Sequence, residues 1–222
     1  MVDQVSIQAR VNKGYAHAAA AAGSVCQWYR PSGPTNPMAP GNLLGPKQAL
    51  INTSSNLSNI TPRQRQKPEG WYAGLDITGI QIGDYLVQPD GDTYFVTTLD
   101  DFSPVRLVLC NAVVTITKPA IMLTVGYNPG YGGDDRSDEP VVATGWPAAL
   151  IKGPRGEVGD AKLPGDVKLP WEELLLPPIP GTILRNDMIV TYNDGAEDRR
   201  LILSMVELTS LGYRCTAILE TA

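Results

Sequence analysis

Short apolar runs separated by turn residues dominate this chain, a pattern that is typical of β-strands. The clearest case is 82–116, which reads I-G-D-Y-L-V-Q-P-D-G-D-T-Y-F-V and ends in V-L-C-N-A-V-V-T-I. The turn Asp90-Gly91 separates two apolar runs, and glycine accepts the positive φ that tight hairpin turns require. A third apolar run follows at 105–116, long enough for a buried strand. We therefore predict a meander of three or more strands.

Residues 185–220 repeat this pattern, with R-N-D-M-I-V-T-Y-N-D-G-A-E-D-R-R-L-I-L near the start and R-C-T-A-I-L-E at the end. An alignment with two single-residue insertions places Asp84 on Asp187, Leu86 and Val87 on Ile189 and Val190, Asp90-Gly91 on Asp194-Gly195, and Cys110-x-Ala112 on Cys215-x-Ala217. The fold class predicted from this repeat is mainly β, with two small duplicated units that are either barrel-like or meanders.

The N-terminal region 1–26 carries the one helical pattern. It runs over 2–22, contains the alanines 18–22, which are strong helix formers, and stops at Gly23, a natural C-cap. An alanine face allows close approach to another backbone. Two interpretations follow: the helix packs on its own domain, or it inserts between neighbouring subunits of an assembly.

Residues 27–70 are predicted to form a long, extended, proline-rich arm. Prolines recur too often for a helix or a central strand, at positions 31, 34, 37, 40 and 46, and 52–59 is a polar Ser/Asn tract. Long unstructured segments are uncommon inside compact domains unless they wrap a partner. The basic residues Arg63, Arg65 and Lys67 lie at the end of the arm and fit either an interface or a solvated loop.

The remaining boundaries follow from composition. The first β-unit is predicted at 71–119 and the second at 179–222, since Pro119 stops the last apolar run of the first. Between them, 120–178 is rich in turn chemistry such as N-P-G and Y-G-G, and we predict an irregular connector with short strands.

Charge and composition narrow the function classes. The chain has 18 Lys+Arg against 23 Asp+Glu, a net charge of −5, which argues against direct binding of nucleic acid. No run approaches the roughly 20 apolar residues of a membrane span, and 1–8 lacks the features of a signal peptide, so we expect a soluble protein made in a cytoplasm. Cys26, Cys110 and Cys215 are expected to be buried thiols rather than a disulfide framework.

Candidate chemistry is sparse. The only histidine, His17, lies in the alanine-rich helix without the partners of a catalytic triad, and no phosphate-binding loop is present. The acids Asp134, Asp135, Asp138 and Glu139 are candidate Ca²⁺ ligands or paired catalytic carboxylates, although their spacing is not that of an EF-hand. We predict no catalytic, cofactor or metal site, and keep a tail-associated glycan hydrolase as an alternative from a different class.

Several short motifs, taken in order, carry a family resemblance. They are V-N-K-G-Y-A-H-A-A at 11–19, Y-R-P at 29–31, W-Y at 71–72, G-D-Y-L-V at 83–87, T-G-W-P-A at 144–148, L-P-G-D-V at 163–167 and L-T-S-L-G-Y-R-C-T-A at 208–217. In this order they resemble a family of structural proteins encoded in the tail modules of tailed phages and proteobacterial prophages. The resemblance extends over essentially the whole chain.

The resemblance implies a non-enzymatic virion component, in the baseplate or at the tail-tube/baseplate junction of a contractile tail. Its expected partners are other tail or baseplate proteins and further copies of itself, in a symmetric ring or trimer. A head-to-tail connector or stopper protein is the alternative within the same class. The residues we predict at interfaces lie in the helix and the arm: Lys13, Tyr15, Tyr29, Arg30, Arg63, Arg65 and Lys67.

Overall fold

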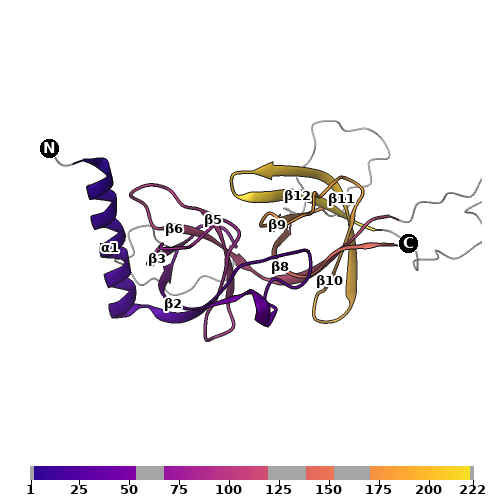
Figure 1. Ribbon diagram of the computed structural model, residues 1–222. Coiled ribbons are helices and arrows are strands. Elements are labelled where there is room, and N and C mark those ends of the chain that lie inside the picture. Colours follow the sequence, from indigo (N-terminus) through magenta and orange to yellow (C-terminus); the bar gives the residue numbers. More distant parts are fainter. Residues whose placement is uncertain (1–2, 54–67, 120–138, 153–170, 221–222) are drawn as a thin grey trace, which may run out of the picture.

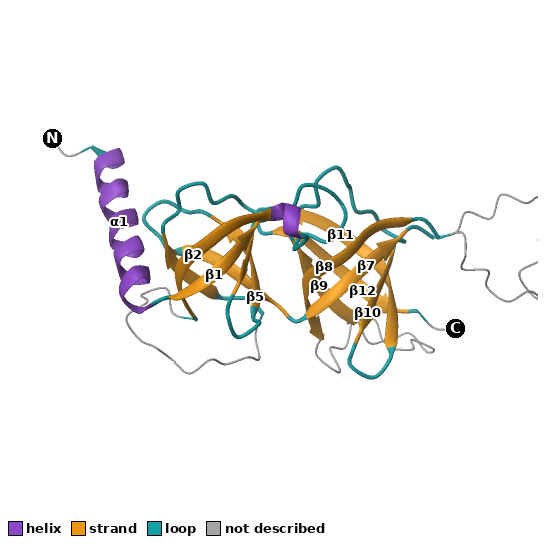
Figure 2. Cartoon of the chain, turned by 60° about the horizontal axis from the view of Figure 1, so that its bottom comes forward, coloured by secondary structure: helices purple, strands orange, loops and turns teal. Residues whose placement is uncertain are grey.

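The computed structural model describes residues 3–53, 68–119, 139–152 and 171–220 of the 222-residue chain. In this part of the chain, an N-terminal helix is followed by two closed β-barrels that lie side by side (Figures 1 and 2). The helix α1 (Gln4–Ala22) lies on the outer side of the first barrel, and the C-terminus lies at the opposite end of the molecule (Figure 1). The mainly β fold with two units and an N-terminal helix is therefore confirmed.

Each barrel has six antiparallel strands in the same order. The first consists of β1 (Ser24–Tyr29), β2 (Leu43–Asn52), β3 (Trp71–Leu75), β6 (Val105–Cys110), β5 (Thr93–Thr98) and β4 (Tyr85–Val87). The second consists, in the equivalent order, of β7 (Ala112–Thr117), β8 (Val141–Lys152), β9 (Trp171–Leu176), β12 (Gly212–Leu219), β11 (Asp198–Thr209) and β10 (Ile189–Asn193). The duplicated unit is thus a whole barrel, larger than the hairpins that revealed it.

The structure corrects the alignment of the two hairpins by one residue. Gly83 and Asp187 both have positive φ, 90° and 69°. Their N–H groups donate equivalent hydrogen bonds, to the carbonyls of Val96 and Leu203 at 2.8 Å each. Gly83 therefore matches Asp187, and Leu86 matches Val190. A slip of one residue would turn side chains to the other face of the sheet, so only this register keeps the apolar residues inside.

The predicted match of the two cysteine segments is wrong. Cys215 and Ala217 lie within β12 of the second barrel. Cys110 instead ends β6 of the first barrel, and Ala112 begins β7 of the second. The apolar run 105–116 is therefore two strands, divided at Asn111. The side chain of Asn111 donates to the carbonyl of Leu150 at 2.8 Å and accepts from its N–H at 2.7 Å, which fixes the point where the chain passes from one barrel to the next.

The predicted arm is also corrected, because it supplies barrel strands, and the short strands predicted in the connector are full strands of the second barrel. Residues of the expected arm form half of β1 and all of β2, joined by a proline-rich connection with one 3₁₀ turn, η1 (Pro40–Asn42). Pro46 lies opposite Gln27 of β1, but β2 pairs with β3 only from Ala49 onward, so one edge of β2 is unpaired at Pro46, a position at which a proline is tolerated. The expected connector contains β8 and β9, and 54–67 lies outside the described residues.

The helix confirms the predicted element and its end at Gly23. Asp3 caps its start by accepting a hydrogen bond from the N–H of Ser6 at 2.7 Å. Gly23 is required by packing, since a Cβ there would lie 2.5 Å from the Ala19 carbonyl oxygen and 2.7 Å from that of Ala49. The helix contacts β2 and β3, as in the interpretation in which it packs on its own domain. Its outer face is exposed, so insertion between subunits stays a prediction.

Candidate interaction surfaces

The two barrels meet through aromatic side chains. Leu86, Tyr94 and Val96 point into the first barrel, so the alternating residues Tyr85 and Phe95 point outward. These outward residues are fully buried because they join the hydrophobic core of the second barrel. The Tyr85 ring lies 6.2 Å from that of Trp146, and the Tyr85 hydroxyl donates to the Pro147 carbonyl at 2.8 Å. The junction is therefore a continuous core that fixes one barrel against the other.

The connection between β1 and β2 lies over the second barrel. The carbonyl of Pro34 accepts hydrogen bonds from the Trp146 indole N–H at 2.8 Å and from the Thr144 N–H at 3.1 Å. Asn36 covers Gly145, where φ is 71° and a Cβ would lie 3.2 Å from the Cβ of Asn36. This part of the predicted arm does wrap a neighbour, but the neighbour is the second barrel of the same chain.

A buried carboxylate organises the side of the first barrel next to this connection. Asp84, which is 1% exposed, accepts hydrogen bonds from the Trp28 indole N–H and the Gln81 N–H at 2.8 Å each. Arg30 binds both oxygens of Asp84, each at 2.8 Å, and this hydrogen bonding raises the pKa of Arg30. The cluster joins the end of β1 to the turn before β4, which gives it a structural role.

The predicted interface residues divide into three groups. Arg30 is engaged with Asp84, and Tyr29 is half-buried against the junction core, so both contribute to contacts within the chain. Tyr15 donates to the Phe102 carbonyl at 3.4 Å, whereas Lys13 is exposed on α1. The basic residues Arg63, Arg65 and Lys67 lie outside the described residues.

The acidic candidates show no arranged site among the described residues. Asp134, Asp135 and Asp138 lie outside them, and Glu139 forms an ion pair with Arg200 at 2.8 Å. Hydrogen bonds from Arg200 to Glu220 and to Glu139 raise the pKa of Arg200. Within the described ranges no group of His, Cys, Asp and Glu has the geometry of a metal site. His17 is exposed on α1.

Comparisons with known proteins gave no match: no family model, no curated protein and no solved structure is significantly similar to this chain. Among the described residues, no helix has the length and apolar character that spanning a membrane requires.

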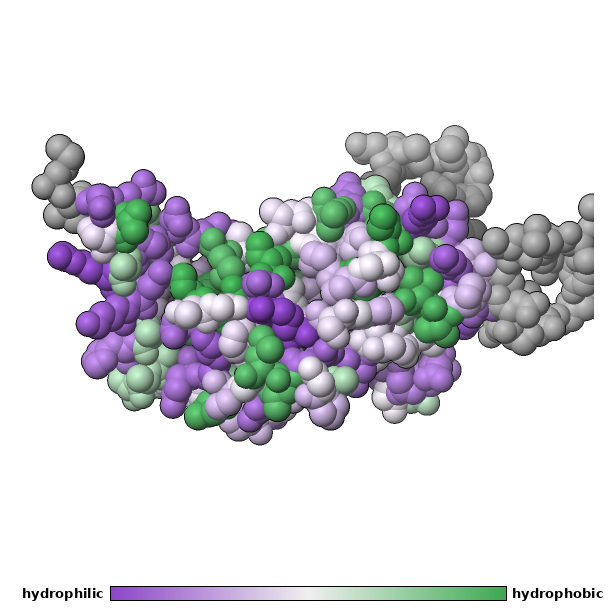
Figure 3. Space-filling view, viewed as in Figure 1, coloured by the Kyte–Doolittle hydropathy of each residue, from purple (hydrophilic) through white to green (hydrophobic). Residues whose placement is uncertain are grey.

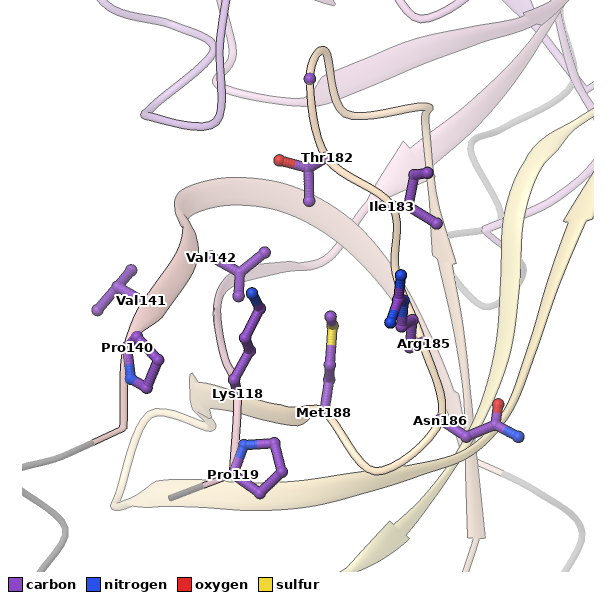
Figure 4. A pocket seen from close by; sticks show the side chains of 11 residues that line it. Lys118, Pro119, Pro140, Val141, Val142, Thr182, Ile183, Arg185, Asn186 and Met188 are labelled. Atoms are coloured by element: carbon purple, nitrogen blue, oxygen red, sulfur yellow. The ribbon is translucent and has the colours of Figure 1, made fainter. Parts of the chain in front are cut away.

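A pocket on the second barrel was not foreseen from the sequence. It has a volume of about 630 Å³ and lies where β7 ends and β8 begins, beside the segment between β9 and β10 (Figure 4). Lys118 and Arg185 lie on opposite sides of the Met188 side chain, with Val142 beside Lys118 (Figure 4). These residues come from three separate segments, so no local sequence motif predicts the pocket.

Exposed apolar side chains add to this surface. Val141 and Ile183, at the pocket, are 62% and 71% exposed. Figure 3 shows that hydrophobic residues on the visible face gather in separate patches, one of them over the hairpin of β11 and β12. Met205, Leu208 and Leu211 of this hairpin are exposed. The surface therefore offers several small apolar areas.

The three cysteines are free thiols, as predicted; Cys26 and Cys215 are buried, whereas Cys110 is half-buried. Burial raises the pKa of Cys215 to about 12 and that of Cys110 further still. Because the thiolate is the reactive form, we expect the native protein to react slowly with a thiol reagent such as DTNB at pH 8 and the urea-unfolded protein to react at once. Rapid modification of Cys215 in the folded chain would contradict this expectation.

Proposed function

We propose that this chain is a non-enzymatic structural subunit of a contractile phage tail, placed in the baseplate or at the junction of tail tube and baseplate. The proposal combines the ordered sequence motifs with one structural observation: two barrels of the same topology share a buried junction. Such a block presents two related outer surfaces in a fixed orientation, which suits a subunit that must hold several neighbours at once.

The exposed surface supports the same proposal. Apolar side chains are exposed on α1, at the pocket and on the hairpin of β11 and β12. Exposed apolar patches are common at sites where proteins associate. The described acidic candidate Glu139 is already ion-paired with Arg200, so it gives no specific support to a glycan hydrolase.

Purified particles test the proposal directly. Virions or tails from a strain that encodes this chain are separated on a density gradient and analysed by quantitative mass spectrometry, with the major tail-tube protein as the reference. We expect the chain in every tail, at a fixed ratio below that of the tube protein. If it occurs in the lysate but is missing from intact tails, the proposal fails.

Antibody labelling in the electron microscope gives the position. Label at the distal end of the tail is the expected result, whereas label at the neck would favour a head-to-tail connector. Deletion of 27–70 is no suitable test, because it would remove β2 and half of β1 and so destroy the first barrel.

A further inference from the structure

We propose that copies of this chain bind one another head to tail, with the loop between β5 and β6 of one copy seated in the pocket between Lys118 and Arg185 of the next. The inference rests on the oligomeric part of the proposed function. It does not depend on where in a phage particle the chain is placed.

The pocket combines positive charge with an apolar floor. Lys118 and Arg185 are exposed, and neither side chain has an ion-pair partner among the described residues. Apolar groups of Met188 and Val142 lie between and beside the two cations (Figure 4). Among the residues that the structure describes, no carboxylate lines the pocket. In a chain with a net charge of −5, such a site favours an occupant with both carboxylates and apolar side chains.

The loop between β5 and β6 has this composition. It reads L-D-D-F over 99–102, and all four residues are exposed. Phe102 is 40% exposed. Asp100 has an ion pair with Arg106 at 3.3 Å, but both groups are about half exposed, so water screens it and Asp100 remains accessible.

The backbone of the loop is held in an unusual conformation. Phe102 has a φ of 60°, which is rare for a residue with a side chain. Its N–H donates to the Gln8 side-chain oxygen at 2.8 Å, and its carbonyl accepts from the Tyr15 hydroxyl at 3.4 Å, so α1 fixes the loop from behind. Strained residues of this kind gather at functional sites, and here the strain directs an aromatic ring toward solvent.

The two features lie on different barrels, the loop at the α1 end of the first and the pocket on the second, where β7 ends (Figure 1). A contact between two different surfaces of identical subunits is heterologous, so it repeats from copy to copy and closes into a ring when the rotation permits. This arrangement agrees with a ring around a tail axis.

One loop in one pocket is a small contact. Stable specific interfaces bury roughly 1,200–2,000 Å² in total, more than a loop of four residues provides. We therefore expect the isolated protein to associate weakly, with an associated fraction that rises with protein concentration. High salt should lower the affinity, because the charges at the contact are exposed.

Charge reversal with rescue tests the contact by sedimentation velocity on the full chain. The loop variant carries Asp100→Lys and Asp101→Lys, and the pocket variant carries Lys118→Glu and Arg185→Glu. Each variant alone opposes like charges and is expected to lose association at least about tenfold. In an equimolar mixture each loop meets a pocket of opposite charge, so association is expected to return.

Two further variants sharpen the result. Phe102→Gly suits the positive φ, so it is expected to leave the fold stable while it weakens association. The double reversal of Glu69 and Glu207 to Lys, at exposed carboxylates outside the loop and the pocket, is the matched control and is expected to change little. Circular dichroism verifies the fold of each variant.

A monomeric wild type at every concentration, or a mixture that fails to recover, would overturn the inference. So would a pocket variant that loses stability but keeps its association, since an acidic segment of the same chain would then be the occupant. Association through this contact in a chain missing from purified tails would refute the proposed function and leave the inference standing.

Discussion

Replacement of Trp146 by alanine is expected to lower the free energy of unfolding by about 4 kcal/mol, the range found when a fully buried tryptophan is truncated. Trp146 is buried in the second barrel, contacts the Tyr85 ring of the first, and donates its indole N–H to the Pro34 carbonyl. The substitution would therefore open a cavity at the junction and remove one of the two hydrogen bonds that the Pro34 carbonyl accepts. Urea unfolding followed by far-UV circular dichroism measures the loss.

Two controls separate packing from the hydrogen bond. Trp146→Phe keeps most of the ring volume and loses the indole N–H, so its loss should be smaller. Trp171→Ala removes the half-buried tryptophan that begins β9 and is expected to cost about 1–2 kcal/mol. Equal losses of unfolding free energy for Trp146→Ala and Trp171→Ala would mean that the junction contributes no more to stability than a half-buried position elsewhere.

Replacement of Asp84 by alanine is expected to cost about 2–3 kcal/mol. Removal of one member of a buried ion pair typically costs about 3–5 kcal/mol, and the lower figure applies because the Arg30 side chain is 31% exposed and partly solvated. The substitution removes the acceptor for Arg30 and for the N–H groups of Trp28 and Gln81. The same urea experiment measures the effect.

Asp84→Asn retains the size of the side chain and one acceptor oxygen, so about half of that loss is expected. Glu207→Ala is the matched control, because Glu207 is an exposed carboxylate on β11 and surface changes of this kind stay within about 0.5 kcal/mol. An Asp84→Ala variant as stable as Glu207→Ala would show that the cluster contributes nothing to stability.

The local signals in the sequence were sufficient for the elements that depend on neighbours in the chain. The hairpins around Asp90-Gly91 and Asp194-Gly195, and the helix that ends at Gly23, were predicted because turn and capping residues act within a few positions. Half of β1 and all of β2 were assigned to an arm, and β8 and β9 to an irregular connector with only short strands. Their prolines and polar residues argue against a central strand, and only their partners show where such residues are tolerated.

The candidate surfaces were less predictable than the fold. Tyr29 and Arg30 stood out as an aromatic and a cation in a proline-rich segment, but the structure directs both toward contacts within the chain. Lys118 and Arg185 carried no signal, since 66 positions separate them and each follows an ordinary strand or turn. A pocket formed by distant segments exists only once the barrel has closed.

The sequence by itself determined that this is a mainly β protein with a repeated hairpin unit, an N-terminal helix and reduced cysteines, because these properties depend on local residue patterns. Tertiary structure alone decided that each unit is a closed barrel. Closure depends on pairs distant in sequence, such as Gln27 with Val87 and Thr117 with Ile189. The same pairings divide 105–116 between the two barrels, because backbone hydrogen bonds must be satisfied all the way around each barrel. Closure of the two barrels in this way also creates the buried junction between them.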